Sequence, residues 1–152
     1  GLTNDAYHIT SPDPEGKGAY NSMRMALKQS GIPLSSDLYF NTHGTGTKAN
    51  DSMELNAIKM LYEGKDIDAN ISSTKSRTGH CLGAAGCIEC ALTLIFMQLN
   101  YIADTYNSNT DMDDELNLNE GLKRNPMFKF ALSNSFAFAG NNASVVIAKD
   151  LV

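Results

Sequence analysis

Two histidines of this chain share one local setting, a short apolar run followed by a turn that contains glycine. His43 lies within residues 40–47, and His80 ends the run of residues 73–80. A strand, a turn and a helix in this order place the side chains of the turn at the open end of a sheet, where ligands bind in layered α/β folds. The pattern therefore predicts an α/β fold in which both imidazoles reach one reacting group.

The spacing of apolar residues predicts the remaining elements. Helices are expected over residues 19–29, 51–61 and 79–100, with Asp51 as the N-cap of the second and Glu54 three residues on in a capping box. Strands are expected over residues 37–41, 67–72, 128–132 and 143–148, the last two joined through residues 134–142. Residues 1–18 read as a loop. These elements predict a mixed β-sheet layered with α-helices, its last pair antiparallel and its first strand truncated.

The segment over residues 79–100 is the most apolar part of the chain. Glu89 is its only carboxylate, so the helix is expected to be buried on most sides, with Glu89 in need of a partner. Cys81, Cys87 and Cys90 match neither a disulfide framework nor a zinc site of two cysteine pairs, and we interpret them as small apolar residues. The polar residues 104–124 predict a long surface connection.

Composition narrows the class of protein. With 152 residues and 42% hydrophobic residues, the chain fits one domain with one packed core. Its net charge of -5 and pI near 5.0 argue against a nucleic-acid or anionic-membrane surface. The apolar run near residues 91–97 is too short to span a bilayer, and no targeting segment is visible, so a cytoplasmic location is expected.

Other kinds of site fit the histidine turns less well. The Gly-Thr-Gly turn completes neither the Walker spacing nor the dinucleotide fingerprint. His43, His80, Asp51 and Glu54 are chemically able to bind a divalent ion, but Lys75 near the second histidine would repel it. A single histidine beside glycine is often only a hydrogen-bonded turn residue, whereas two in matched settings favour a functional pair. We therefore predict no metal site.

Five segments together resemble the β-ketoacyl-acyl-carrier-protein synthases. They are Asp-Ala-Tyr-His-Ile-Thr at residues 5–10, His-Gly-Thr-Gly-Thr at 43–47, Ser-Thr-Lys-Ser at 73–76, Gly-His at 79–80 with Leu-Gly-Ala-Ala-Gly at 82–86, and Ser-Asn-Ser-Phe at 133–136. The match runs almost end to end. It implies that residues 1–152 form a single carboxy-terminal ketoacyl synthase domain, half of a thiolase-like fold.

The resemblance implies a decarboxylative Claisen condensation, in which an acyl thioester on a cysteine is extended from malonyl-acyl-carrier protein. Neutral imidazole N–H donors in a dry site stabilise the enolate that decarboxylation leaves, and His43 and His80 match that role. Lys75 matches the lysine that orders the site, with Glu89 paired to its network and Glu54 in the same cluster. The pathway stays open between fatty acid synthesis and a polyketide or polyene route.

Three further positions match the family. Thr45 and Thr47 match hydroxyls that hydrogen-bond the phosphopantetheine arm of the carrier protein, although both could simply stabilise the turn. Phe138 matches a gate residue whose backbone N–H helps to form an oxyanion hole. The chain departs from the family pattern at Ala137 and Ala139, where glycine is usual; alanine is strained if φ is positive, and altered loop mobility is expected.

The resemblance also implies what these residues lack. The nucleophilic cysteine of the family belongs to an amino-terminal half that does not occur among these 152 residues, so the chain alone is expected to be inactive. The expected partners are that half, acyl carrier protein, for which Arg77 is the one hint of a docking surface, and a second copy in a homodimer; no covalently bound cofactor is expected. Two alternatives are a thiolase, disfavoured because residues 134–144 hold no cysteine, and a non-catalytic partner similar to a chain-length factor.

Overall fold

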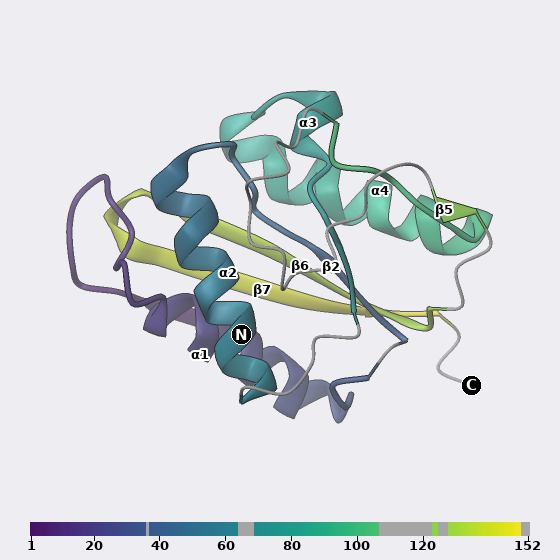
Figure 1. The fold of residues 1–152 in the computed structure, drawn as a ribbon, viewed down its shortest axis with the longest axis horizontal. Coiled ribbons are helices and arrows are strands. Elements are labelled where there is room, and N and C mark those ends of the chain that lie inside the picture. Colours follow the sequence, from purple (N-terminus) through teal and green to yellow (C-terminus); the bar gives the residue numbers. More distant parts are fainter. Residues whose placement is uncertain (36, 64–68, 107–122, 125–127, 150–152) are drawn as a thin grey trace.

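Helices cover both faces of a mixed sheet (Figure 1). The computed structural model describes residues 1–35, 37–63, 69–106, 123–124 and 128–149. The five strands follow the order β1-β7-β6-β2-β3. Parallel pairs join β2 (Leu38–Asn41) to β3 (Asn70–Ser72) and to β6 (Phe130–Ala137), and antiparallel pairs join β7 (Asn141–Ala148) to β6 and to β1 (Leu2–Asn4). The predicted α/β class, the mixed sheet and the antiparallel last pair are confirmed.

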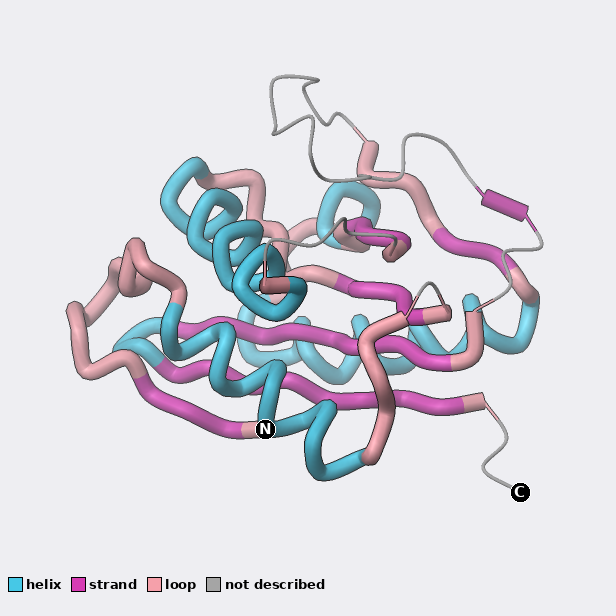
Figure 2. Tube along the Cα trace, turned by 60° about the horizontal axis from the view of Figure 1, so that its bottom comes forward, coloured by secondary structure: helices cyan, strands magenta, loops and turns pink. Residues whose placement is uncertain are grey.

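Strand β2 lies between β6 and β3 in the sheet, and helices flank the sheet on both faces (Figure 2). Leu38 and Phe40 pack with the helices α1 (Lys17–Ser30) and α2 (Lys48–Tyr62), whereas Tyr39 packs with residues of α4 (Ala85–Leu99) on the other face. All four residues of β2 are buried, as expected of a parallel strand covered on both faces.

Two of the predicted helices form, and both begin earlier than expected. Helix α1 buries an apolar stripe and ends at Gly31, whose φ of 70° suits glycine. Helix α2 begins at Lys48 with Thr47 as its N-cap, so Asp51 lies in the first turn and is not the cap. Glu54 forms no capping box, because its carboxylate is buried and accepts hydrogen bonds from the turn after β2.

The ends of the sheet differ from expectation. The predicted loop over residues 1–18 begins with β1, in which Leu2 pairs with Ala143 at one edge of the sheet. Strands β6 and β7 are longer than predicted and leave only the short 3-10 turn η2 (Phe138–Gly140) between them. Asn134, which was expected in the segment joining the two strands, is instead a buried strand residue that hydrogen-bonds Glu54.

The predicted helix over residues 79–100 is divided, and it is not buried on most sides. A short α3 (Lys75–Thr78) and a 3-10 turn η1 (Leu82–Ala84) precede α4. Positive φ values at Gly79 and Leu82, 71° and 49°, interrupt the helical path. The buried residues of α4 form one narrow stripe, made up of Ala85, Glu89, Thr93, Phe96 and Met97.

The opposite face of α4 is apolar and exposed, with Leu94, Ile95 and Leu99 on it. Cys87 is also exposed, although it lies in the helix that was expected to be buried on most sides, while Cys81 and Cys90 are half-buried. With η1 included, residues Leu82–Leu99 have the length and apolar character of a membrane span, and 28% of this segment is buried. This corrects the estimate that the run is too short, but core helices meet the same criterion, and Glu89 and Thr93 fasten α4 to the sheet through Asn41.

A second, two-stranded antiparallel sheet was not predicted. It pairs β4 (Tyr101–Ile102) with β5 (Lys123–Arg124). Most of the polar connection expected over residues 104–124 lies outside the described residues, as do residues 67 and 68 of the strand predicted over 67–72.

Candidate active site

Three of the predicted site residues follow the carboxyl ends of parallel strands. His43 lies just beyond β2, Lys75 just beyond β3 and Phe138 directly after β6. Because β3, β2 and β6 are parallel neighbours, their carboxyl ends lie at the same edge of the sheet. This edge is where ligands bind in α/β folds, so the topology brings distant parts of the sequence to one place.

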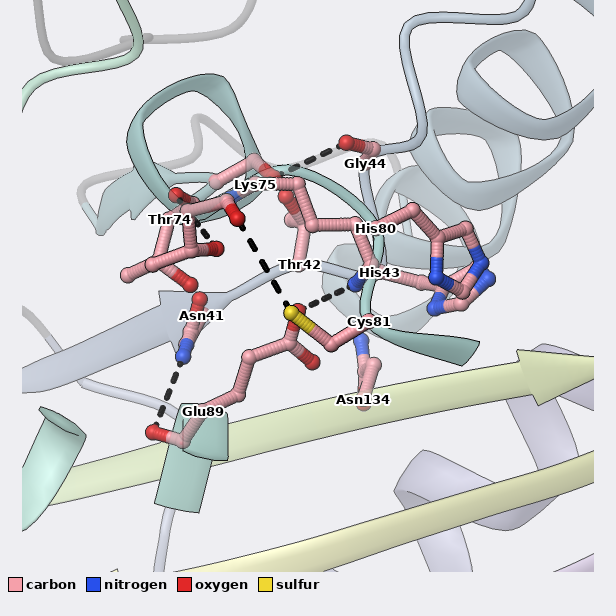
Figure 3. Close-up of polar contacts among 12 residues, drawn as sticks. Asn41, Thr42, His43, Gly44, Thr74, Lys75, His80, Cys81, Glu89 and Asn134 are labelled. Carbon is pink, nitrogen blue, oxygen red and sulfur yellow. Dashed lines mark hydrogen bonds and ion pairs between the residues drawn. The ribbon is translucent and has the colours of Figure 1, made fainter. Parts of the chain in front are cut away.

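His43 and His80 are in contact. Their ring centroids are 5.4 Å apart and the rings are nearly perpendicular, at 86°; Figure 3 shows the two rings side by side. The Nδ1 atom of His80 accepts a hydrogen bond from the backbone N–H of Leu82 at 3.1 Å. In the neutral ring the proton is therefore on Nε2, which leaves His80 with one N–H donor to offer.

His43 is held as a neutral imidazole. Burial lowers its pKa to about 3, with smaller contributions from the positive charges of Lys75 and of protonated His80. Its ring also packs against Phe136, with centroids 5.8 Å apart. Among the described residues its Nδ1 atom has no hydrogen-bond partner. A neutral ring in an apolar setting can donate a hydrogen bond to a developing negative charge without carrying a charge itself.

Lys75 and Glu89 form the buried ion pair that the sequence led us to expect for Glu89. Both side chains are almost completely covered, with 4% and 2% of their surface exposed. Burial raises the pKa of Glu89, and the hydrogen bond and charge of Lys75 oppose that rise. The pair joins α3 to α4 and places a positive charge close to His43.

Glu54 supports the His43 turn through the backbone. Its carboxylate accepts hydrogen bonds from the N–H groups of His43 at 2.8 Å and Gly44 at 2.9 Å, and from Asn134 Nδ2 at 3.0 Å. Burial raises its pKa to about 7 against these hydrogen bonds and the weaker effect of Lys75. Gly44 suits this turn because its φ is positive and a Cβ would lie 2.5 Å from Ser73 Cβ.

Two buried amides were missed by the sequence interpretation. Asn41 donates to Thr93 Oγ1 at 3.0 Å and to the backbone oxygen of Glu89, which fixes α4 beside β2. Asn134 bridges β6 and Glu54. Their signal was available, since each amide lies within or directly after an apolar run, and a buried amide requires a partner.

The remaining predicted residues lie around this centre. Thr45 and Thr47 are hydrogen-bonded to each other, with their hydroxyl oxygens 2.9 Å apart at the start of α2. Phe138 is 72% exposed. Ala139 has a φ of 59°, so the positive φ considered from the sequence is present, and its N–H donates to the Ile9 oxygen at 2.6 Å.

Arg77 is already engaged. Its guanidinium donates to both carboxylate oxygens of Asp104, at 2.9 and 3.0 Å, and lies over the ring of Tyr106, 4.4 Å from the centroid. These contacts weaken its interpretation as a carrier-protein contact. Within the described parts of the chain, no three His, Cys, Asp or Glu side chains gather in a group able to hold a metal ion.

Comparison with known families agrees with this arrangement. Residues 1–109 match the family described as Beta-ketoacyl synthase, C-terminal domain. The chain belongs to this family. The ketoacyl synthase domain is 40% identical over 150 residues to 3-oxoacyl-(acyl-carrier-protein) synthase 2 of Rhizobium meliloti (strain 1021), a match that covers 98% of the chain and 35% of that protein. It is also 42% identical over 144 residues to Nodulation protein E of Rhizobium sp. (strain N33), covering 94% of the chain and 35% of that protein.

Solved structures are similar as well. The ishigamide ketosynthase/chain length factor matches with a TM-score of 0.89 and 32% identity, over 99% of this chain and 36% of that one. A ketosynthase from Xenorhabdus doucetiae, in complex with its chain length factor, matches with a TM-score of 0.86 and 36% identity. This match covers 99% of this chain and 38% of that one. The ketoacyl synthase domain therefore has the thiolase-like fold of these ketosynthases, and it spans about a third of the length of its relatives.

Proposed function

We propose that this domain supplies the decarboxylation side of a 3-oxoacyl-acyl-carrier-protein synthase. The observation that carries the proposal is the contact of His43 and His80, two imidazoles whose N–H groups can share one oxyanion, beside the Lys75–Glu89 pair. In the reaction, the bond between the malonyl carboxylate and the α-carbon breaks, carbon dioxide leaves and the electron pair forms an enolate. The enolate oxygen then accepts hydrogen bonds from the two rings.

The carbon–carbon bond forms in the next step. The enolate carbon attacks the carbonyl of an acyl thioester, whose cysteine comes from sequence outside these 152 residues, and the cysteine leaves as a thiolate. We assign the backbone N–H of Phe138 to the oxyanion of that step. Thr45 and Thr47 are assigned to the phosphopantetheine arm of an acyl carrier protein, because each hydroxyl can exchange its partner for an amide of the arm.

The low pKa of His43 supports this role. An imidazole that stays neutral at pH 7 remains a hydrogen-bond donor without first binding a proton, and it does not repel the positive charge of Lys75. A non-catalytic partner similar to a chain-length factor would have no need for this arrangement. The partners proposed for the complete enzyme are acyl carrier protein, the nucleophile-bearing portion and a second copy of the whole.

The test is a chimera that joins this domain to the remaining portion of the Rhizobium meliloti relative. We expect release of labelled carbon dioxide from malonyl-acyl-carrier protein, reduced at least 100-fold by His43→Ala or His80→Ala, since an oxyanion donor is worth about 10²–10³ in rate. Lys28→Ala, on the exposed side of α1, is the matched control and should leave the rate unchanged. A folded chimera that releases carbon dioxide equally well without either histidine would contradict the proposal.

A further inference from the structure

A line of buried hydrogen bonds joins helix α1 to the turn that carries His43. Ser22 Oγ lies 2.9 Å from Ser144 Oγ, and Ser144 Oγ donates to Asn134 Oδ1 at 2.9 Å. Asn134 Nδ2 donates in turn to Glu54. The four side chains come from α1, β7, β6 and α2, and all of them are buried.

The direction of these hydrogen bonds follows from the chemistry of the groups. An ionised carboxylate accepts hydrogen bonds only, whereas an amide side chain has one donor end and one acceptor end. The donor end of Asn134 must therefore face Glu54, and its acceptor end needs a donor on the opposite side. The Ser144 hydroxyl is that donor.

Ser22 completes the line. Because the single hydroxyl proton of Ser144 is used on Asn134, Ser22 is the donor in the serine pair. The Ser22 hydroxyl also lies 2.8 Å from the backbone oxygen of Ala19, so its proton is shared between two acceptors. Ser144 therefore constrains the orientation of the Asn134 amide more strongly than Ser22 does.

We propose that Ser144, assisted by Ser22, is a positioning residue of the active site, whose hydroxyl fixes the orientation of the Asn134 amide and through Glu54 holds the backbone of the His43 turn. The importance of this turn for catalysis rests on the proposed function. The hydrogen-bond line itself does not, because it is defined by contacts within the domain. Without the Ser144 hydroxyl, the Asn134 oxygen loses its donor, and the amide is free to rotate its oxygen toward the Glu54 carboxylate.

The titration of Glu54 reports directly on this arrangement. The groups that face Glu54 are the amides of His43 and Gly44 from the turn after β2, Asn134 from β6 and the charge of Lys75 from α3. Met23 of α1, whose sulfur lies 3.2 Å from Asn134 Nδ2, adds no charge. Since burial raises the Glu54 pKa to about 7, the titration is accessible without acid denaturation.

The experiment follows the backbone amide resonances of His43 and Gly44 by NMR between pH 5 and 9, in the 152-residue chain. Both amides donate to Glu54, so their shifts change as it ionises. We expect Ser144→Ala to raise the Glu54 midpoint by about one pH unit, because it weakens one hydrogen bond to a charged group. Ser22→Ala should raise it by less. Ser30→Ala is the control, since it removes a hydroxyl of α1 that bonds only the local backbone, and it should leave the midpoint unchanged.

The outcomes separate positioning from simple packing. A Ser144→Ala variant that is less stable but has the wild-type Glu54 midpoint would overturn the proposal. If that variant does not fold, Ser22→Ala decides, and an unshifted midpoint there overturns it. The readout requires no turnover, so an inactive chimera with shifted midpoints would refute the proposed function while leaving the positioning role in place.

Discussion

The Lys75 ammonium and the Glu89 carboxylate form an ion pair that is nearly closed off from water. Neither partner has an alternative ion pair in the described part of the chain. Removing both charges from water costs several kcal/mol, which their mutual attraction offsets only while both are present. Substituting one residue of the pair should therefore lower the free energy of unfolding more than substituting both.

We expect Glu89→Gln to lower the free energy of unfolding by about 3–5 kcal/mol, because it leaves the Lys75 charge buried without a counter-charge. The double variant Lys75→Met with Glu89→Leu should lose much less of the free energy of unfolding. Urea unfolding of both variants measures the two losses. The exposed pair of Lys17 and Glu15 is the control, and Glu15→Gln should leave the free energy of unfolding essentially unchanged, because solvent screens this pair. Equal losses in the single and double variants would show that the charges are not coupled.

The pKa shifts of Glu54 and His43 predict opposing effects of pH on stability. Burial raises the Glu54 pKa from 4.5 to about 7, so its contribution is fully present below pH 4.5 and is lost as the pH rises to about 7. Burial lowers the His43 pKa from 6.5 to about 3, so its contribution is present above pH 6.5 and is lost as the pH falls to about 3. Between pH 4.5 and 6.5 the two contributions to the free energy of unfolding therefore change with pH in opposite directions.

Substituting one of these two residues should reveal how the other makes the free energy of unfolding depend on pH. Between pH 4.5 and 6.5 we expect the stability of His43→Gln to fall by about 1.4 kcal/mol per pH unit relative to wild type, and that of Glu54→Gln to rise by a similar slope. Denaturant unfolding at four pH values in this window gives both slopes. Parallel curves for the two variants would mean that at least one group is not titrating as its burial requires.

Much of this arrangement was accessible from sequence because short-range patterns encode it. The apolar stripe of α1 and the glycine turn after β2 are local features, and both formed where expected. The split before α4 was missed because Leu82 has a positive φ, which apolar periodicity does not register. The length of β6 was missed because Asn134 is buried by a partner 80 positions away, and such pairing is a property of the folded sheet.

The burial of α4 was overestimated for a related reason. Apolar composition shows that a helix face avoids water, but it does not show what covers that face. Glu89 and Thr93 turn one stripe of the helix toward β2. The opposite face, which carries Leu94, Ile95 and Leu99, stays exposed in the described part of the chain. The roles proposed for His43, Lys75 and His80 came from motif resemblance, whereas the contact between the two histidine rings is visible only in the fold.

Ala139 predicts a stabilising substitution. Its φ of 59° is a left-handed conformation that costs alanine roughly 1 kcal/mol relative to glycine. We expect Ala139→Gly to raise stability by about 0.5–1 kcal/mol and to slow hydrogen exchange of its N–H, which bonds Ile9. Ala137→Gly is the matched control; its φ of -124° is ordinary for alanine, so glycine there should destabilise by about 0.5–1 kcal/mol. If both substitutions changed stability in the same direction, backbone strain would be ruled out as the cause.

The exposed face of α4 predicts self-association of the isolated domain. Leu94 is 48% exposed and Leu99 62% exposed on a helix whose other stripe is buried, and a contiguous apolar surface of this kind favours association. We expect the average mass from light scattering to rise with concentration. Leu94→Glu combined with Leu99→Lys should restore a monomer without changing the circular dichroism spectrum, because neither side chain is part of the core.

The control for this prediction is Met25→Glu, which places a charge on the exposed side of α1, away from α4. It should leave the association unchanged if α4 is the contact surface. The remaining portion of the Rhizobium meliloti relative, added in excess, should compete with self-association if it covers the same face. A wild-type domain that stays monomeric, or a Met25→Glu variant that dissociates as fully as the α4 variant, would place the contact elsewhere.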